Sequence, residues 1–407
     1  MKCFTLIMLS LVSFSVSADV VVPTDRVTNR VVVRAEATSQ SADVGSLNPG
    51  QQLEFVRNVP RWREVRLSLT KTGFVTKSFT TVIDDPALSR AVMLIHFLNT
   101  GTGSCVIVEC PGPSAPPMIV DCGSIGRTAT DKDATAARTY IKGVLDKHPG
   151  IQPNLVLSHA DRDHYNLLPS VLTEQVNEIW QGVDPDEYTQ SGFPVWFDNQ
   201  ISGGADPHDD SDMPPNFHND QKPLDELPCG LASAFVLTVN TGTTKNAQSL
   251  VLQIEYDEFS IIFTGDATGA TEAQAMSNYS NALDTTVLTG SHHGANTEGS
   301  NGTSAASSNW ASDTQPEILV YQSGTGFGHP RCTVTDSFDD RTVTATKHPF
   351  HCGKHNGTMP DVALDEPTVE AKYATEKNGT IVITTDGVTS AQVTCDLTPE
   401  CASVIPL

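Results

Sequence analysis

The stretch His159-Ala160-Asp161-Arg162-Asp163-His164 constrains this chain most, because four side chains that bind divalent metals fall within six positions. The apolar run Leu155-Val156-Leu157 leads directly into it and predicts a buried strand. The ligands then lie on the loop at the carboxyl end of that strand, where open α/β sheets carry their sites. Such a loop can serve two metals about 3.5–4 Å apart. The alternative is a solvated acidic loop, which two histidines bracketing two aspartates disfavour.

Two later strand ends carry side chains of the same kind. Asp266 follows the apolar run at 261–263, and a carboxylate there can either bridge two cations or cap a helix. His292 and His293 follow a predicted strand at 285–289. One of them can complete a metal site while the other contacts substrate or protonates a leaving group. The alternative is a pair of histidines on a surface turn.

Seven motifs, in the order in which the family has them, resemble those of the metallo-β-lactamase superfamily, whose signature is H-x-H-x-D-H. Asp161 stands where the second His usually stands, and this H-x-D-x-D-H variant is similar to the hydrolase domain of competence proteins of the ComEC type. The resemblance runs from about residue 91 to about residue 390. Its other motifs are His96–Ser104, Met118–Gly123, Asn246–Leu252, Phe263–Asp266, Ser291–Gly294 and Gly328–Pro330.

The resemblance implies an α/β fold, an αββα sandwich over residues 90–395, and two divalent metal ions. It places Asp266 between both metals and favours His292 as the histidine that completes the second. His293 then acts on the substrate side, and Asp163 serves catalysis as well as binding. The full expected ligand set is His159 and Asp161 for the first metal, Asp163, His164 and His292 for the second, and Asp266 for both.

The metal follows from the donor types. Imidazole suits Zn²⁺, whereas the extra carboxylate of Asp161 suits a harder ion such as Mn²⁺, so we expect Zn²⁺ first and Mn²⁺ next. Such a pair lowers the pKa of bound water towards 7 and supplies a hydroxide for attack. The superfamily usually has a further His between the two halves. Here only His208 and His218 lie in that interval, and water is the third possibility.

Residues 19–85 predict a separate small β domain. Short alternating or apolar segments at 31–34, 52–56, 62–67 and 73–75 are separated by turns. Their spacing resembles bacterial SH3 domains, small barrels that often bind cell-wall peptides. A cell-wall ligand and a scaffold without a ligand are both open for this SH3-like β-barrel, and Trp62 is either core or a ligand platform. Asp84-Asp85-Pro86 reads as the joint to the next domain.

The amino terminus predicts export. Residues 1–18 have a basic start, an apolar run and the small-residue pattern Val16-Ser17-Ala18, which is typical of a secretory signal peptide. Its removal leaves eight cysteines, and an even count in an exported chain favours disulfides. Cys332 with Cys352, and Cys395 with Cys401, are plausible local pairs. We therefore expect a secreted or periplasmic protein with no membrane span.

Charge narrows the substrate. The chain has 25 Lys and Arg against 48 Asp and Glu, a formal net charge of −23. An acidic surface repels polyanions and argues against tight nucleic-acid binding. We therefore expect an exported hydrolase of a small or envelope-associated phosphodiester. The alternatives are an inactive wall-binding or adhesive protein, which Asn99 and Ser104 in place of the family's usual Asp favour weakly, and a lactone or β-lactam hydrolase.

Several other elements are expected. Residues 131–147 and 166–178 predict helices, with Ala137, Tyr140, Ile141, Val144 and Leu145 on the buried face of the first. Residues 184–230 lack clear periodicity and predict an irregular insertion near the site. His329 is a candidate substrate-side acid, a contact behind the ligands or part of a plain turn. Residues 396–407 are expected to be a C-terminal tail.

Overall fold

The computed structural model describes residues 19–24, 26–49, 53–68, 71–84, 91–112, 114–125, 132–209, 227–279, 283–297, 304–324, 327–354 and 362–407. The chain divides into two compact units, Met1–Ala91 and Val92–Leu407. The expected signal peptide, residues 1–18, lies outside the described residues. Among the helices of the described ranges, none is both long and apolar enough to cross a membrane.

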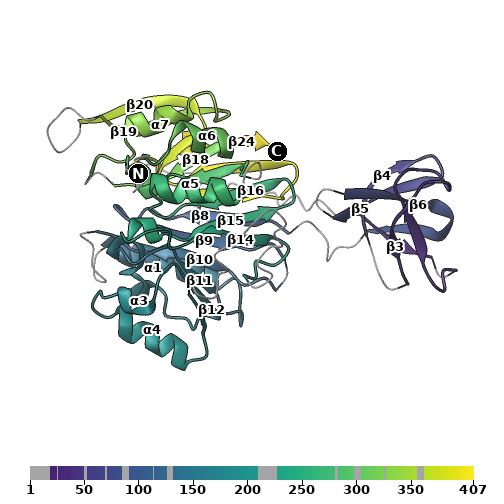
Figure 1. Ribbon diagram of the computed structural model, residues 1–407, viewed down its shortest axis with the longest axis horizontal. Helices are drawn as coiled ribbons and strands as arrows, with labels where there is room; N and C mark the ends of the chain where they lie inside the picture. The colour runs from purple at the N-terminus through teal and green to yellow at the C-terminus, as the bar shows by residue number, and fades with distance from the viewer. Residues whose placement is uncertain are drawn as a thin grey trace, which may run out of the picture. The chain divides into compact units, whose positions relative to one another are not determined.

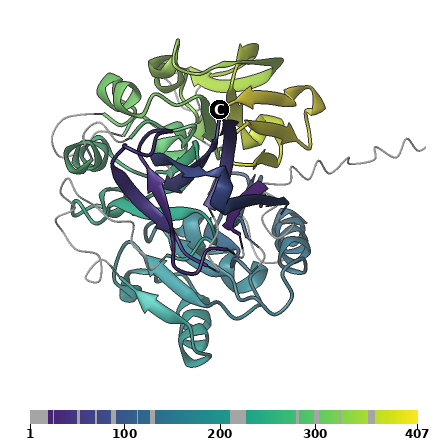
Figure 2. The same ribbon diagram turned by 90° about the vertical axis from the view of Figure 1, so that its right-hand side faces the viewer.

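The first unit is a single seven-stranded sheet (Figures 1 and 2). Val21, Val33, Leu47 and Val65 form its buried core, whereas Trp62 is only half-buried. Within the described strands no pairing joins β3 to β7, so the closed SH3-like barrel is not seen. β1 pairs with β4 on one side and with β7 on the other, so β7 and β3 are the two edges of the sheet. The order is β3 (Asp43–Leu47), β2 (Val31–Arg34), β6 (Lys71–Thr76), β5 (Trp62–Ser68), β4 (Leu53–Val59), β1 (Asp19–Pro23) and β7 (Thr80–Asp84).

The second unit contains two large sheets and a long hairpin, β19 (Thr344–Lys354) with β20 (Val362–Glu370). The nine-stranded sheet has the order β13 (Asp206–His208), β12 (Glu178–Gln181), β11 (Asn154–Leu157), β10 (Met118–Cys122), β9 (Cys105–Glu109), β8 (Met93–Phe97), β22 (Ile381–Thr385), β23 (Ser390–Cys395) and β24 (Ser403–Pro406). The six-stranded sheet has the order β14 (Ser233–Thr238), β15 (Val251–Tyr256), β16 (Phe259–Phe263), β17 (Val287–Thr289), β18 (Ile318–Tyr321) and β21 (Lys372–Ala374).

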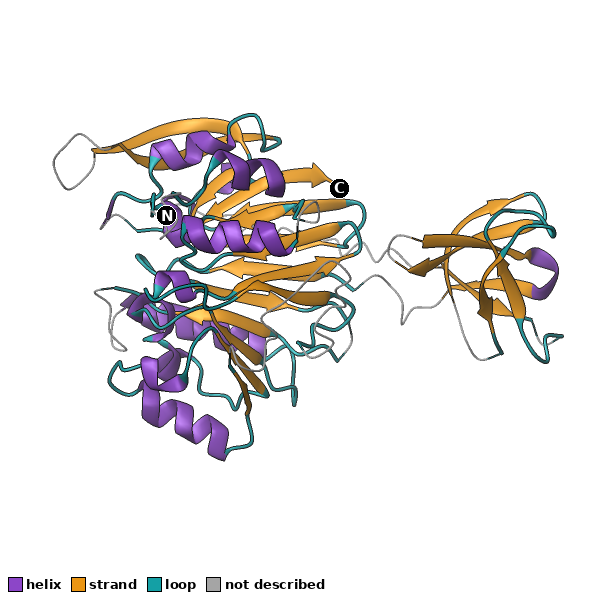
Figure 3. Ribbon diagram, in the orientation of Figure 1, coloured by secondary structure: helices purple, strands orange, loops and turns teal. Residues whose placement is uncertain are grey.

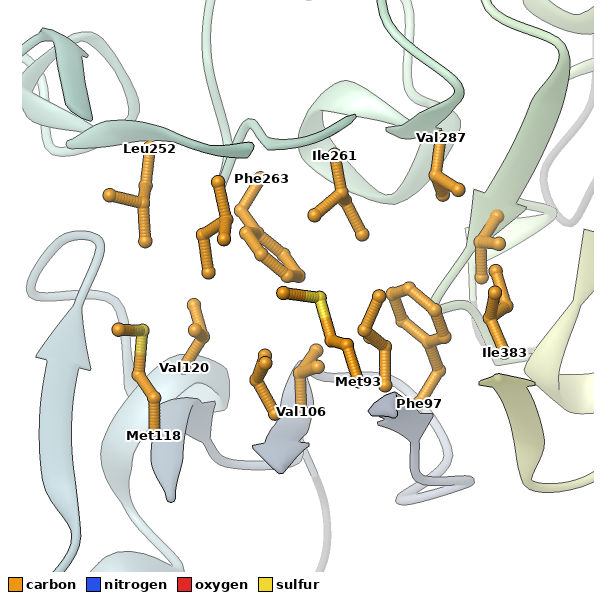
Figure 4. Close-up of a cluster of buried hydrophobic side chains, with 14 of the residues drawn as sticks. Met93, Phe97, Val106, Met118, Val120, Leu252, Ile261, Phe263, Val287 and Ile383 are labelled. Carbon is orange, nitrogen blue, oxygen red and sulfur yellow. The ribbon is translucent and has the colours of Figure 1, made fainter. Parts of the chain in front are cut away.

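The main core lies between these two sheets (Figure 4). Met93, Ile95 and Phe97 alternate along β8 and point into it, as the period of two of a strand requires. They meet Ile261 and Phe263 of the facing sheet. This alternation sends His96, between them, to the opposite face of the sheet, where it contacts Tyr140.

Helices cover the outer faces of both sheets, which gives four layers (Figure 3). The expected amphipathic helix is confirmed as α1 (Lys132–Leu145), with Ala137, Ile141 and Val144 buried against the nine-stranded sheet. The helices α3 (Leu168–Val171) and α4 (Phe193–Ser202) lie on the same side. The six-stranded sheet is covered by α5 (Gly269–Asn278) and α6 (Ser308–Thr314).

Two expected elements differ in the structure. The helix predicted at 166–178 is not formed: these residues contain only α3 and the start of β12, and the one-turn helix α2 (Arg162–Tyr165) lies before them. Leu172, which ends α3, has extended backbone with φ −112° and ψ 95°, so the helix stops there. The insertion expected at 184–230 contains α4, whose Phe193 and Phe197 are buried; residues 210–226 lie outside the described part.

The end of the chain is built into the sheet rather than forming the expected tail. Residues 403–406 form β24, which pairs with β23. Ile405 faces the core with 1% exposure, and burial of that side chain explains why the segment adds to the sheet. The expected pairs Cys332–Cys352 and Cys395–Cys401 are confirmed as disulfides. Two further disulfides join Cys105 to Cys122 and Cys110 to Cys229.

Candidate metal centre

The candidate ligands gather where parallel strands of both sheets end. In the nine-stranded sheet β10 and β11 run parallel, and in the six-stranded sheet β16, β17 and β18 run parallel. Carboxyl ends of parallel strands share one edge. Asp121 lies at the end of β10, and the loops after β11, β16 and β17 carry the 159–164 stretch, Asp266 and the histidine pair.

Asp121 organises the loop after β11. Its Oδ1 accepts a hydrogen bond from Ser158 N at 2.8 Å, and its Oδ2 accepts from Ser158 Oγ at 2.7 Å. The same Oδ2 lies 2.7 Å from His164 Nδ1. Asp121 has a left-handed φ of 55°. A Cβ on Gly123 would lie 2.3 Å from the carbonyl carbon of Asp163, so only glycine allows this turn to pack against the ligand loop.

These contacts set which imidazole nitrogens face the centre. His164 Nδ1 donates to a carboxylate, and His293 Nδ1 donates to the Gln322 carbonyl oxygen at 2.6 Å. Ser158 Oγ gives its proton to Asp121 and is therefore left to accept from His159 Nδ1, 3.0 Å away. A histidine whose Nδ1 is held in this way presents the lone pair of Nε2 to a metal.

Asp266 lies at the middle of the cluster, 2% exposed. Its Oδ2 is 3.6 Å from His159 Nε2 and 3.4 Å from His292 Nε2. Its Oδ1 is 3.1 Å from His164 Nε2 and 3.5 Å from His293 Nε2. The two oxygens of one carboxylate therefore face two different pairs of imidazoles.

The two adjacent histidines, His292 and His293, face different oxygens of Asp266. His293 Nε2 lies 3.4 Å from Asp163 Oδ2 and 3.3 Å from His164 Nε2, which groups His293 with Asp163 and His164. His292 faces the Asp266 oxygen that also faces His159. The resemblance had favoured His292 for the second metal and His293 for the substrate side. The difference arises from the backbone, because both residues have left-handed φ values, 47° and 57°, that splay their rings.

A cation fits this arrangement. Two overlapping groups of donor atoms each lie within 4.8 Å: His159, His164 and Asp266, and Asp163, His164 and His293. Within the described part of the chain, His159 Nε2 and Asp266 Oδ1 are buried without a hydrogen-bond partner. Buried polar atoms are normally paired, so unpaired donors that converge on one space indicate a site for a metal ion.

The electrostatics agree with that assignment. Burial lowers the pKa of His159 to about 4, and His164 adds to the effect against the opposing carboxylates of Asp266 and Asp121. His159 is therefore a neutral imidazole at pH 7. Burial alone would lower the pKa of His164 too, but Asp266 and Asp121 outweigh it and raise that pKa well above its usual value. A cation that binds there must displace a proton.

Asp161 lies at the rim of the cluster. Its Oδ2 is 3.8 Å from His159 Nε2, and its side chain is 37% exposed. Its Oδ1 is 3.3 Å from Lys245 Nζ, which also donates to the Ala160 carbonyl oxygen at 2.8 Å. Lys245 therefore holds one oxygen of Asp161 and leaves the other directed towards His159.

Three other histidines considered from the sequence belong to neither donor group among the described residues or lie outside the described part. His208 stacks on Trp180 with ring centroids 4.2 Å apart and belongs to neither donor group, whereas His218 lies outside the described residues. His329 is close to the centre, with its ring centroid 6.0 Å from that of His292. Burial, together with the neighbouring His293 and His292, lowers the pKa of His329 to about 3.

Sequence analysis did not identify two contributing residues, Lys245 and Glu272, nor the contact of Asp121 with His164. Glu272 Oε1 accepts from Ser291 Oγ at 2.7 Å, and both its oxygens lie 2.9 Å from Ala306 N. The motif Asp121-Cys122-Gly123 was recognised in the sequence, but the residue that Asp121 contacts was not predicted. Lys245 and Glu272 belong to no motif, so only the fold brings them to the centre.

No family model and no curated protein matches this sequence. Among solved structures, CmlA, a diiron β-hydroxylase from Streptomyces venezuelae, matches at 12% identity and a TM-score of 0.32, over 59% of this chain and 46% of that one. Igni18, a metallo hydrolase from Ignicoccus hospitalis, matches at 11% identity and a TM-score of 0.34. The match covers 68% of this chain and 98% of that one. A Thermotoga maritima protein described as a putative Zn-dependent hydrolase of the metallo-β-lactamase superfamily matches at 11% identity and a TM-score of 0.23. The match covers 56% of this chain and 74% of that one.

The chain thus spans less than half the length of CmlA. All three TM-scores are below 0.5, so the function is inferred from the donor geometry rather than from these resemblances.

Proposed function

We propose that this chain is an exported, binuclear metal-dependent phosphodiesterase. The observation that carries the proposal is Asp266, whose two carboxylate oxygens each face a separate pair of imidazoles. A carboxylate placed between two pairs of imidazoles could be shared by two metal ions, which is an arrangement that suits a two-metal hydrolase. The four disulfides of the second unit support export.

We infer two ligand sets that share one carboxylate. Imidazole donors outnumber carboxylates, which favours Zn²⁺ over Mn²⁺. Two such cations would supply Lewis acidity and a water of lowered pKa. The first set is His159, Asp161, His292 and Asp266 Oδ2; the second is Asp163, His164, His293 and Asp266 Oδ1.

The chain's own residues prepare this centre for a small anion. Asp121 and Gln322 fix the orientation of His164 and His293 before any ligand binds, which reduces the reorganisation that the reaction requires. Lys245, with 44% of its side chain exposed beside Asp161, offers a positive charge to an incoming phosphodiester. The strongly acidic chain as a whole favours a small or envelope-associated substrate over long nucleic acid.

Metal analysis joined to a three-substrate screen tests the proposal. We expect the purified mature protein to contain about two equivalents of Zn²⁺ and to hydrolyse bis-(p-nitrophenyl) phosphate faster than a chromogenic lactam or a lactone. Faster lactam or lactone cleavage would replace the phosphodiesterase with the other hydrolase alternative. A protein without stoichiometric metal and without turnover would instead support the wall-binding or adhesive alternative.

A further inference from the structure

An exposed aromatic ring lies beside the metal centre. Phe327 is 41% exposed, although most large apolar side chains among the described residues are buried. Ile125, 37% exposed, lies on a neighbouring loop. Thr102 lies beside Ile125 and beside Gly324, three residues before Phe327: Ile125 N donates to the Thr102 carbonyl oxygen at 2.7 Å, and a Cβ on Gly324 would lie 2.5 Å from Thr102 N. Two exposed apolar side chains thus share the edge that carries the ligands.

A chain of rings connects Phe327 to the centre. The Phe327 ring stacks on His329 with an interplanar angle of 30° and centroids 6.0 Å apart. His329, 9% exposed, meets the ring of His292 edge-on, again at 6.0 Å. His292 in turn faces Asp266. Phe327 therefore stands two ring contacts from a candidate ligand, on a buried support that fixes one of its faces.

This arrangement suits a planar group attached to the reacting phosphate. An exposed aromatic ring supported from behind offers a π surface, and bases and aryl rings stack on such surfaces irrespective of their hydrogen-bonding edges. A substrate whose phosphodiester lies at the metal centre can extend an attached ring towards Phe327. Alkyl substituents would gain less, because they have no π face to stack.

We propose that Phe327, supported by His329, is a stacking subsite for an aromatic substituent of the substrate, so that the preferred substrates are phosphodiesters carrying a nucleobase or an aryl ring. The inference rests on the proposed phosphodiesterase function. Loss of a base–aromatic stack by alanine substitution typically weakens binding by about fivefold to about 150-fold. The same range is expected here for Phe327→Ala.

Binding of product-like monoesters tests the subsite without turnover. Calorimetry on the metal-loaded mature protein should give phenyl phosphate and thymidine 5′-monophosphate at least about fivefold lower Kd values than methyl phosphate. Cyclohexyl phosphate, matched in size but not aromatic, should remain close to methyl phosphate. Equal Kd values for phenyl and cyclohexyl phosphate would overturn stacking. Tight phenyl phosphate with weak thymidine monophosphate would identify aryl esters rather than nucleotides.

Variants locate the effect. Phe327→Ala should bring all the Kd values within about threefold of methyl phosphate, while Phe327→Trp should keep the aromatic preference. Phe79→Ala, which removes a 50% exposed phenylalanine of the first unit, is the matched control and should change nothing. An aromatic preference that survives Phe327→Ala would place the subsite elsewhere.

Kinetics separate this inference from the proposed function. The wild-type protein should cleave thymidine 5′-p-nitrophenyl phosphate with a higher kcat/KM than methyl p-nitrophenyl phosphate, and Phe327→Ala should remove most of that ratio. Cleavage of both esters at equal kcat/KM would refute the subsite while the phosphodiesterase stands. A preference in binding without cleavage of either ester would refute the phosphodiesterase while the subsite stands.

Discussion

His292 and His293 place two consecutive non-glycine residues in the left-handed region. Each such residue costs roughly 1–2 kcal/mol, and strain of this kind persists only where the surroundings over-determine the conformation. Here His292 N donates to the Gly265 carbonyl oxygen at 3.0 Å, and His293 Nδ1 is held by Gln322. The strain is used to direct two neighbouring rings to two halves of one centre. No sequence pattern encodes that splay, which is why the two histidines could not be assigned from the motif.

Asp163 tests the two-metal arrangement most directly. Asp163→Ala removes a carboxylate whose Oδ2 lies 3.4 Å from His293 Nε2. We expect loss of the second metal equivalent and a fall of more than a hundredfold in kcat, with an unchanged circular dichroism spectrum. Asp186→Ala, at an exposed position, is the control. Turnover retained within about tenfold, only about 1.4 kcal/mol of barrier, would contradict a two-metal mechanism.

Lys245 provides a second residue-scale prediction. Groups that hold a metal ligand in place typically account for about 10- to 100-fold in metal affinity, and Lys245 Nζ lies 3.3 Å from Asp161 Oδ1. Lys245→Met should therefore weaken the first metal by that factor and leave the second unchanged, as measured by titration against a fluorescent chelator. Lys142→Met, on the exposed face of α1, should have no effect. Tighter binding in Lys245→Met would mean that the ammonium only repels the cation.

Individual strands and helices were predictable where the spacing of apolar residues is distinct. The strands that end at the ligands are short apolar runs followed by metal-binding side chains, and β11, β16 and β17 were located from that pattern alone. The amphipathic face of α1 was equally clear. By contrast, α6 consists largely of Ser, Asn, Asp and Thr, whose preferences disfavour a helix. It forms because Trp310 and Ala311 pack on the six-stranded sheet, a tertiary effect that local sequence does not reveal. The helix α5 was missed although its alanines and the capping box at Thr268 favour a helix.

Glu272 connects the missed helix α5 to the ligand turn and gives a pH prediction. Burial raises the pKa of Glu272 to about 8, despite hydrogen bonds from Ala306 and Ser291 that lower it. The native state therefore binds this proton more tightly than the unfolded state does. The resulting stabilisation is complete below about pH 4.5 and decreases as the pH rises towards 8. Glu272→Gln keeps the shape and removes the titration.

Calorimetry of the two proteins checks this slope. The Tm of Glu272→Gln relative to the wild type should be higher at pH 9 than at pH 5, since only the wild type must bury a charge at high pH. Glu187→Gln, at an exposed position, should show a constant difference. Parallel Tm curves for the wild type and Glu272→Gln would show that Glu272 does not titrate in this range.

The change in charge along the chain falls close to the boundary between the two compact units. Residues 19–85 carry nine Lys or Arg and eight Asp or Glu, whereas the remainder of the mature chain carries fifteen against forty. The boundary between the units lies at Ala91 and Val92, a few residues beyond the expected joint at 84–86. Every proposed metal ligand lies after residue 158. The strand pattern, the Asp84-Asp85-Pro86 segment and the charge all placed the expected joint, whereas closure of the small sheet into a barrel depends on strand pairing that these features do not determine.

A fragment beginning at Val92 tests whether the first unit serves the chemistry or the substrate. The second unit has its own core between two large sheets, so we expect the fragment to fold alone and to keep the full kcat/KM on bis-(p-nitrophenyl) phosphate. On insoluble wall material its rate should fall, because tethering by a wall-binding unit raises the local substrate concentration without new contacts at the metal centre. Equal loss on both substrates would mean that residues 19–91 shape the active site. Full rates on both would leave the first unit as a spacer, or mean that the wall is not its target.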